Sequence, residues 1–203
     1  MSVIGTASHL NLAADTLPPL VARAVDTARA QDFAYSCRPE QGRLLHALAG
    51  GARRIGETGT GCGVGLAWLL AGAPDGARLV SVEADPGRAR VCAGLFGSVP
   101  GVEILAGDWR RIAERAPYDL LVLDGGGMGK ADGDPPADVG RLLAPGGTVV
   151  VDDFTPPDAT PPELREALDG ARRHWLEHPL LRTVELRLAP DLSTLVGTLR
   201  SGH

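Results

Sequence analysis

The stretch RRIGETGTGCG (residues 53–63) decides the fold, because it joins a short strand to a glycine-rich loop and then to the apolar run GVGLAWLLAG (63–72). A strand, a glycine loop and a helix in this order form the ligand-binding turn of open α/β sheets. The dinucleotide fingerprint GxGxxG is incomplete, because the sixth position is Val64 counted from Gly59 and Leu66 counted from Gly61. The loop therefore disfavours a nicotinamide-dependent oxidoreductase.

Around this stretch, short apolar runs alternate with amphipathic stretches, a pattern typical of a parallel sheet with crossover helices. We expect strands at 53–58, 78–83, 102–105, 118–124 and 147–152, separated by helices at 63–72, 86–97, 108–115 and 135–143. A helix at 161–178 and two β-rich runs at 182–188 and 193–199 follow, and the turn-prone APDL between these runs indicates a hairpin. The predicted fold is α/β: a Rossmann-like, doubly wound, mostly parallel sheet of seven strands with a C-terminal antiparallel β-hairpin.

The N-terminal part of the chain carries helical patterns near 17–30 and 39–49. We expect residues 1–50 to form a helical cap over the carboxyl ends of the strands, and residues 51–203 to form the ligand-binding domain. At 203 residues, the two parts are expected to make a single structural domain.

Composition and charge narrow the function classes. Twenty basic and 25 acidic side chains give a formal net charge of −5, which argues against nucleic acid as a partner. Three widely spaced cysteines without a CxxC pair suggest neither a disulfide framework nor a structural zinc site. The start of the chain lacks the pattern of a signal peptide, and no apolar run is long enough to cross a membrane, so we expect a cytoplasmic protein.

The glycine loop has the pattern acidic-x-Gly-x-Gly-x-Gly, which resembles motif I of the class I S-adenosylmethionine (SAM)-dependent methyltransferases. In that family the loop wraps the methionine portion of SAM, and the acidic residue interacts with the same end. Carboxylates and carbonyls suit the sulfonium and ammonium of SAM, whereas a pyrophosphate prefers backbone N–H groups. The resemblance implies that residues 51–203 bind SAM through Glu57, Gly59, Thr60, Gly61 and Gly63.

Further motifs stand at the ends of later strands. Glu83 ends the second strand, where an acidic side chain can accept both ribose hydroxyls. In the resembled family the position of Gly107, Asp108 and Trp109 contacts the adenine, with Asp108 suited to the exocyclic amine and Trp109 to stacking. Asp108 could instead be a helix N-cap and Trp109 a core residue. Asp124 ends the fourth strand and completes the set of predicted cofactor-binding residues.

A closer resemblance rests on CRPE (37–40), LAPGG (143–147), VVVDDF (149–154) and the terminal hairpin. Together with the glycine loop, these motifs are similar to those of the small catechol-type O-methyltransferases, especially the bacterial ones, over about residues 33–199. The resemblance implies a small hydroxylated substrate and a homodimer built through the N-terminal helices.

It also implies a magnesium ion held by Asp124, Asp152 and Asp153, with Asp153 standing where the family has asparagine. Converging carboxylates repel each other unless a cation or proton intervenes, and hard oxygen ligands suit Mg²⁺. The family's general base is a lysine three residues after the first metal aspartate, but that position is Gly127 here. Lys130, the only lysine of the chain, lies three residues further along a glycine-rich loop.

The sequence thus predicts a SAM-dependent methyltransferase acting on a hydroxyl of a small molecule, with or without a divalent metal. Asp152 or Asp153 would bind and acidify the hydroxyl, while Lys130 would take its proton. The expected acceptor pocket comprises Tyr35, Met128, Lys130, Phe154 and Trp175. The alternative, prompted by the missing family lysine, is a catalytically degenerate SAM-fold protein that binds a nucleoside ligand or a partner.

Overall fold

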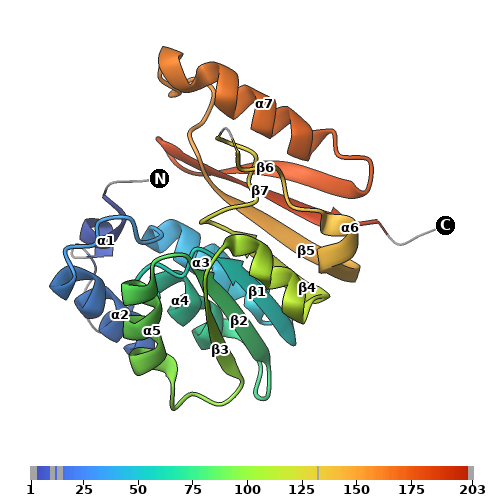
Figure 1. Ribbon diagram of the computed structural model, residues 1–203. Helices are drawn as coiled ribbons and strands as arrows, with labels where there is room; N and C mark the ends of the chain where they lie inside the picture. The colour runs from blue at the N-terminus through green and yellow to red at the C-terminus, as the bar shows by residue number, and fades with distance from the viewer. Residues whose placement is uncertain (1–3, 10–11, 13–15, 132, 201–203) are drawn as a thin grey trace.

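The computed structural model describes residues 4–9, 12, 16–131 and 133–200. Within these residues the chain forms a seven-stranded sheet in the order β3-β2-β1-β4-β5-β7-β6 (Figure 1). The strands are β1 (Arg54–Thr58), β2 (Arg78–Glu83), β3 (Val102–Ala106), β4 (Tyr118–Leu123), β5 (Leu143–Phe154), β6 (Leu181–Ala189) and β7 (Leu192–Leu199). Strands β1 to β5 pair in parallel, and β7 pairs antiparallel with both β5 and β6. The predicted Rossmann-like doubly wound sheet with a C-terminal hairpin is confirmed.

Each central strand buries both of its faces. In β4, Leu120 and Val122 join one core cluster, while Leu121 and Leu123 join another on the opposite face. The first cluster is completed by α2 (Pro19–Ala30), α3 (Pro39–Ala49), α4 (Val64–Gly72) and α5 (Pro86–Phe96), and the second by the 3-10 helix η3 (Trp109–Arg115), α6 (Val139–Leu142) and α7 (Arg165–Leu176). Burial on both faces explains why these strands are continuously apolar in sequence.

The N-terminal helices α2 and α3 pack against α4 and so extend the helical layer on one face of the sheet (Figure 1). The contact between α3 and α4 is close, because a Cβ on Gly42 would lie 2.2 Å from Nε1 of Trp68. The connection between α2 and α3, rather than the helices themselves, reaches the carboxyl ends of the strands. The short helix α1 (Gly5–Ser8) precedes them. A domain boundary at residue 50 stays a prediction.

Three expected elements differ most from their predicted bounds. The helix expected at 135–143 is reduced to α6, because consecutive prolines at 135–136 disfavour a helical start. Strand β5 begins at Leu143 and not at 147, with a register shift against β4 between Tyr118 and Leu120. The helix expected at 161–178 is divided into the 3-10 turn η4 (Pro162–Leu164) and α7. No helix in the described part of the chain is long and apolar enough to cross a membrane.

Candidate functional site

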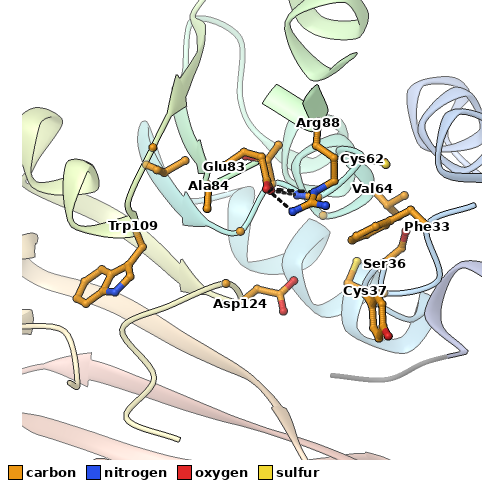
Figure 2. Close-up of a pocket in the computed structure, with 18 residues that line it drawn as sticks. Phe33, Ser36, Cys37, Cys62, Val64, Glu83, Ala84, Arg88, Trp109 and Asp124 are labelled. Atoms are coloured by element: carbon orange, nitrogen blue, oxygen red, sulfur yellow. Dashed lines mark hydrogen bonds and ion pairs between the residues drawn. The ribbon is translucent and has the colours of Figure 1, made fainter. Parts of the chain in front are cut away.

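A cavity of about 360 Å³ lies at the carboxyl ends of β1, β2 and β4 (Figure 2). The glycine loop after β1 lines one side, and Phe33, Tyr35, Ser36 and Cys37 of the connection between α2 and α3 form one wall. Of the predicted cofactor-binding residues, those that line it are Gly59, Thr60, Gly61, Glu83, Gly107, Trp109 and Asp124. The structure therefore brings together the motifs that follow four successive strands.

The glycine loop is shaped by close contact with the loop after β4. Gly59 and Gly63 have φ values of +85° and +89°, which side chains rarely adopt. A Cβ on Gly125 would lie 2.3 Å from Cα of Gly59, so the two backbones touch. Thr58 reinforces this contact, because its hydroxyl donates to the Gly126 carbonyl at 2.9 Å. The loop between β1 and α4 is thus held rigidly with its backbone exposed to the cavity.

Glu57 lies beneath this loop and is 1% exposed. Its Oε2 accepts a 2.5 Å hydrogen bond from the Ser81 hydroxyl, which lies 2.6 Å from the Thr60 hydroxyl. Burial raises the pKa of Glu57 to about 8, against the opposing effect of the Ser81 hydrogen bond. Glu57 is not among the described residues that line the cavity, and a Cβ on Gly65 would lie 2.5 Å from its Oε1. Its contact with a cofactor stays a prediction.

Glu83 is the best-organised acidic group of the cavity. Its side chain is 4% exposed and accepts hydrogen bonds from the backbone N–H of Gly61 at 2.8 Å and of Asp85 at 2.9 Å. Arg88 adds an ion pair of 2.8 Å, drawn in Figure 2, and its guanidinium lies 5.4 Å from the ring centre of Phe33. These contacts fix the Glu83 carboxylate against the glycine loop, at the wall of the cavity.

Of the three residues predicted to contact adenine, two line the cavity and one does not. Gly107 and Trp109 line the cavity, and the Trp109 ring points away from its centre, toward Gly126 (Figure 2). Asp108 is exposed and caps η3, where its side chain accepts from the N–H of Arg110 at 2.9 Å. Of the two roles considered for Asp108, the structure shows the helix cap.

Beyond the cavity, the chain's only lysine lies at the end of β5. Lys130 Nζ donates to the carbonyl oxygens of Asp152 and Asp153, the second at 2.8 Å. The same atom lies 4.0 Å from the ring centre of Phe154. Asp124 lines the cavity next to this group. Among the described residues, no three carboxylate, histidine or cysteine side chains are grouped closely enough to hold a metal ion.

The titration of these groups reflects burial among like charges. Burial, followed by the charge of Asp153, raises the pKa of Asp152 to about 7. Burial and the neighbouring aspartates raise the pKa of Asp124 well above its ordinary value. Burial lowers the pKa of Lys130 to about 8, although the three carboxylates oppose this change. The pKa values of Asp152 and Lys130, about 7 and about 8, lie near neutral pH, as acid–base groups of an active site require.

The expected acceptor pocket is only partly formed. Tyr35 is 46% exposed at the cavity wall. Trp175 was expected to contact the acceptor, and this prediction is wrong: the ring is 0% exposed, and its Nε1 donates to the Met128 carbonyl at 2.8 Å. Phe154 is also buried, beneath the Lys130 ammonium. Trp175 therefore anchors the loop that carries Met128 and Lys130.

Sequence reasoning missed several cavity residues. Arg88 and Phe33 were not predicted, although Arg88 stands in the first turn of α5, five residues after Glu83. Cys37 lines the cavity as well, and burial with nearby carboxylates raises its thiol pKa. The sequence feature that could have identified this wall of the cavity is the pair of aromatic residues, Phe33 and Tyr35, in the short connection between α2 and α3.

Comparisons with known proteins agree with this geometry. A family model described as a methyltransferase domain matches residues 57–154. A Mycobacterium ulcerans protein named "Putative O-methyltransferase" is 32% identical over 167 residues, covering 77% of this chain and 72% of its own length. A Mycolicibacterium vanbaalenii protein of the same name is 35% identical over 141 residues, or 64% of this chain. This chain spans only 58% of that relative's length.

Solved structures show the same fold. The O-methyltransferase from Bacillus cereus in complex with S-adenosylhomocysteine (SAH) aligns with a TM-score of 0.75 at 18% identity, covering 98% of both chains. The O-methyltransferase TomG from Streptomyces achromogenes, in complex with SAM, aligns with a TM-score of 0.69 at 22% identity and covers 98% of this chain and 97% of its own. The glycine loop, the sheet order with its terminal hairpin and the M. ulcerans relative agree, and the chain belongs to the O-methyltransferase family of the class I, SAM-dependent fold.

Proposed function

We propose that this protein transfers a methyl group from SAM to a hydroxyl of a small molecule. The observation that carries this proposal is the cavity at the glycine loop, in which the Glu83 carboxylate is held by the backbone N–H of Gly61. The names of the relatives, and the SAM or SAH in the two solved structures, support the same cofactor.

The residues of the cavity fit this cofactor chemically. A volume of about 360 Å³ is at the lower end of the range for small-molecule sites. The Glu83 carboxylate can accept hydrogen bonds from the two ribose hydroxyls, as acidic residues at this strand end do in related folds. The Asp124 carboxyl faces the cavity (Figure 2), where a sulfonium or ammonium would stabilise its charged form.

When bound, SAM supplies an electrophilic methyl group: the acceptor oxygen forms the new bond to carbon, the carbon–sulfur bond breaks, and its electron pair stays on sulfur. The sequence predicted Lys130 as the base, but its ammonium donates to two carbonyl oxygens. In this proposal the hydroxyl proton passes instead to the Asp152 carboxylate, whose pKa of about 7 suits a base at neutral pH. Lys130, hydrogen-bonded to the carbonyls of Asp152 and Asp153, supplies positive charge beside the developing oxyanion. The rigid glycine loop contributes by orienting the two reactants.

The resemblance also implies Mg²⁺ at Asp124, Asp152 and Asp153. Three carboxylates are suitable oxygen donors, but their arrangement does not fit the ion. Asp152 Oδ1 instead accepts the backbone N–H of Asp153 at 2.7 Å, and the Lys130 ammonium lies against the carbonyls of both residues. The described residues therefore do not form a metal site.

A catalytically degenerate SAM-binding protein is the second candidate. It is favoured by Gly127, the position of the family's lysine, which has a φ of +79° and lies against Trp109 and Ala137. A Cβ there would lie 3.0 Å from the Trp109 ring, so no side chain fits without movement. This candidate predicts cofactor binding without turnover.

Calorimetric titration with SAM, SAH and NAD⁺ tests the proposal, followed by methyl transfer from labelled SAM to a panel of phenols, catechols and aliphatic alcohols. We expect micromolar binding of SAM and SAH, none of NAD⁺, and transfer to a panel member. Absence of SAM and SAH binding would refute the proposal, and binding without transfer to any acceptor would favour the degenerate candidate. The homodimer and the cytoplasmic location remain predictions, and light scattering of the purified protein tests the first.

A further inference from the structure

The position of Lys130 relative to the three aspartates carries a further inference. Its ammonium donates to the backbone carbonyls of Asp152 and Asp153 and lies 4.0 Å from the ring centre of Phe154. Carbonyl oxygens, an aromatic face and neighbouring carboxylates all attract a cation. The chain thus places a positive charge of its own at the carboxyl end of β5, against the backbone of Asp152 and Asp153.

The loop that carries Lys130 is held on both sides of the lysine. On the N-terminal side, the Met128 carbonyl accepts from Trp175 Nε1 at 2.8 Å. Gly129, with a φ of +73°, lies so close to Pro136 that a Cβ would approach its ring to 2.7 Å. On the C-terminal side, the N–H of Asp134 donates to the Ala131 carbonyl at 3.1 Å. The lysine is therefore positioned by the fold and is not a surface side chain that happens to reach the site.

A divalent ion and this ammonium compete for the same place. Asp153 has a left-handed backbone (φ +57°), and its N–H binds Asp152 Oδ1, so that oxygen is turned toward the backbone. An added ion would share Asp152 with this bond and would lie beside a like charge, which is strongly unfavourable where water is excluded.

We propose that the Lys130 ammonium is the resident cation of the acceptor site, in the place of a divalent metal ion, and that methyl transfer by this protein needs no such ion. This inference rests on the proposed function. In the described part of the chain the ammonium contacts two carbonyl acceptors, which leaves one of its three N–H groups for the acceptor oxygen. That N–H stabilises the negative charge on the oxygen as the hydroxyl proton passes to Asp152.

The first test measures metal binding, without any need for turnover. Mn²⁺ is titrated into the full chain saturated with SAH, and free Mn²⁺ is followed by electron paramagnetic resonance. We expect no saturable site in the wild type or in Lys130→Arg, and stronger Mn²⁺ binding in Lys130→Met, because that substitution removes the repulsion between the ammonium and a second cation. Saturable Mn²⁺ binding to the wild type that disappears in Asp152→Asn would overturn the inference.

The second test measures transfer from labelled SAM in EDTA and in Mg²⁺. We expect equal rates for the wild type, and a loss of about 100-fold in Lys130→Met with SAH affinity unchanged. Arg187→Met is the matched control, because it removes a surface cation paired with the exposed Asp158, and it should behave as the wild type. Activity lost on chelation and restored by Mg²⁺ would contradict the inference.

The two tests separate failure of the inference from failure of the proposed function. If the proposed function fails, SAH does not bind and no transfer occurs in either buffer. If only the inference fails, SAH binds and the wild type takes up Mn²⁺ at the aspartates.

Discussion

Replacement of Glu83 by glutamine tests the cofactor site most directly. The Glu83 side chain is 4% exposed and accepts from Gly61 N, Asp85 N and Arg88. Glutamine keeps the shape, but it removes the charge and turns an NH₂ group toward one of these donors. A hydrogen bond to a charged group contributes about 1.5–3 kcal/mol, so weaker ribose binding should raise the SAH dissociation constant about 10- to 150-fold. The buried donor left without an acceptor should lower the free energy of unfolding by about 1–3 kcal/mol.

Calorimetric titration with SAH measures the first effect, and urea unfolding measures the second. Glu103→Gln is the matched control, because Glu103 also pairs with an arginine, Arg115, at 2.7 Å, but both side chains are more than 40% exposed. An exposed pair of this kind contributes about 0–1 kcal/mol, so SAH affinity should not change. If folded Glu83→Gln bound SAH within about twofold of the wild type, the assignment of Glu83 to the ribose would be wrong.

Three further substitutions probe the loops around the cavity. Gly125→Ala, which forces a Cβ against the glycine-loop backbone at 2.3 Å, should cost about 1–3 kcal/mol in urea unfolding, whereas Gly94→Ala in α5, with open space around its Cβ, should be neutral or stabilising. Glu57→Gln should flatten the dependence of stability on pH: the folded pKa of about 8 exceeds the unfolded value near 4.5, so wild-type stability falls by up to about 1.4 kcal/mol per pH unit across that window. The check is urea unfolding of both proteins at three pH values. If this assignment were wrong, the free energy of unfolding would depend on pH equally in the wild type and in Glu57→Gln. Trp175→Phe removes the hydrogen bond to Met128 and should cost about 1–3 kcal/mol, with slower methyl transfer but unchanged SAH affinity; a parallel loss of affinity would show that the loop also shapes the cofactor cavity.

Much of the fold was predictable because the central strands are apolar on both faces. Strand β2 matches its predicted bounds, and β1 and β4 differ from theirs by one residue. Strand β5 was predicted too short, since Pro145 and two glycines resemble a loop in sequence but lie within a strand that shifts register against β4. Local composition indicates where a strand is buried, but the register of its neighbour decides where pairing begins.

The candidate site was predictable where it depends on strand ends, and not where it depends on side-chain direction. The position of Glu83 follows from the end of β2, whereas its partner Arg88 depends on the orientation of α5. Trp175 resembled an acceptor contact in sequence, but its ring is turned into the core under α7. Spacing alone could not show this, because a tryptophan on an amphipathic helix can face either the core or a neighbouring loop.

The charged groups at the carboxyl ends of the strands favour a cationic ligand, independently of the glycine motif. Arg88 neutralises Glu83, and Lys130 places a positive charge beside the end of β5. Glu57 and Asp124 instead have pKa values raised by burial and by nearby carboxylates, so their charged forms are disfavoured in the folded protein. A cationic ligand in the cavity would favour the charged form of Asp124, whereas an anionic pyrophosphate would disfavour it further. SAM carries a sulfonium and an ammonium, and NAD⁺ carries a pyrophosphate, so the incomplete GxGxxG pattern and the electrostatics of the cavity disfavour the dinucleotide for separate physical reasons.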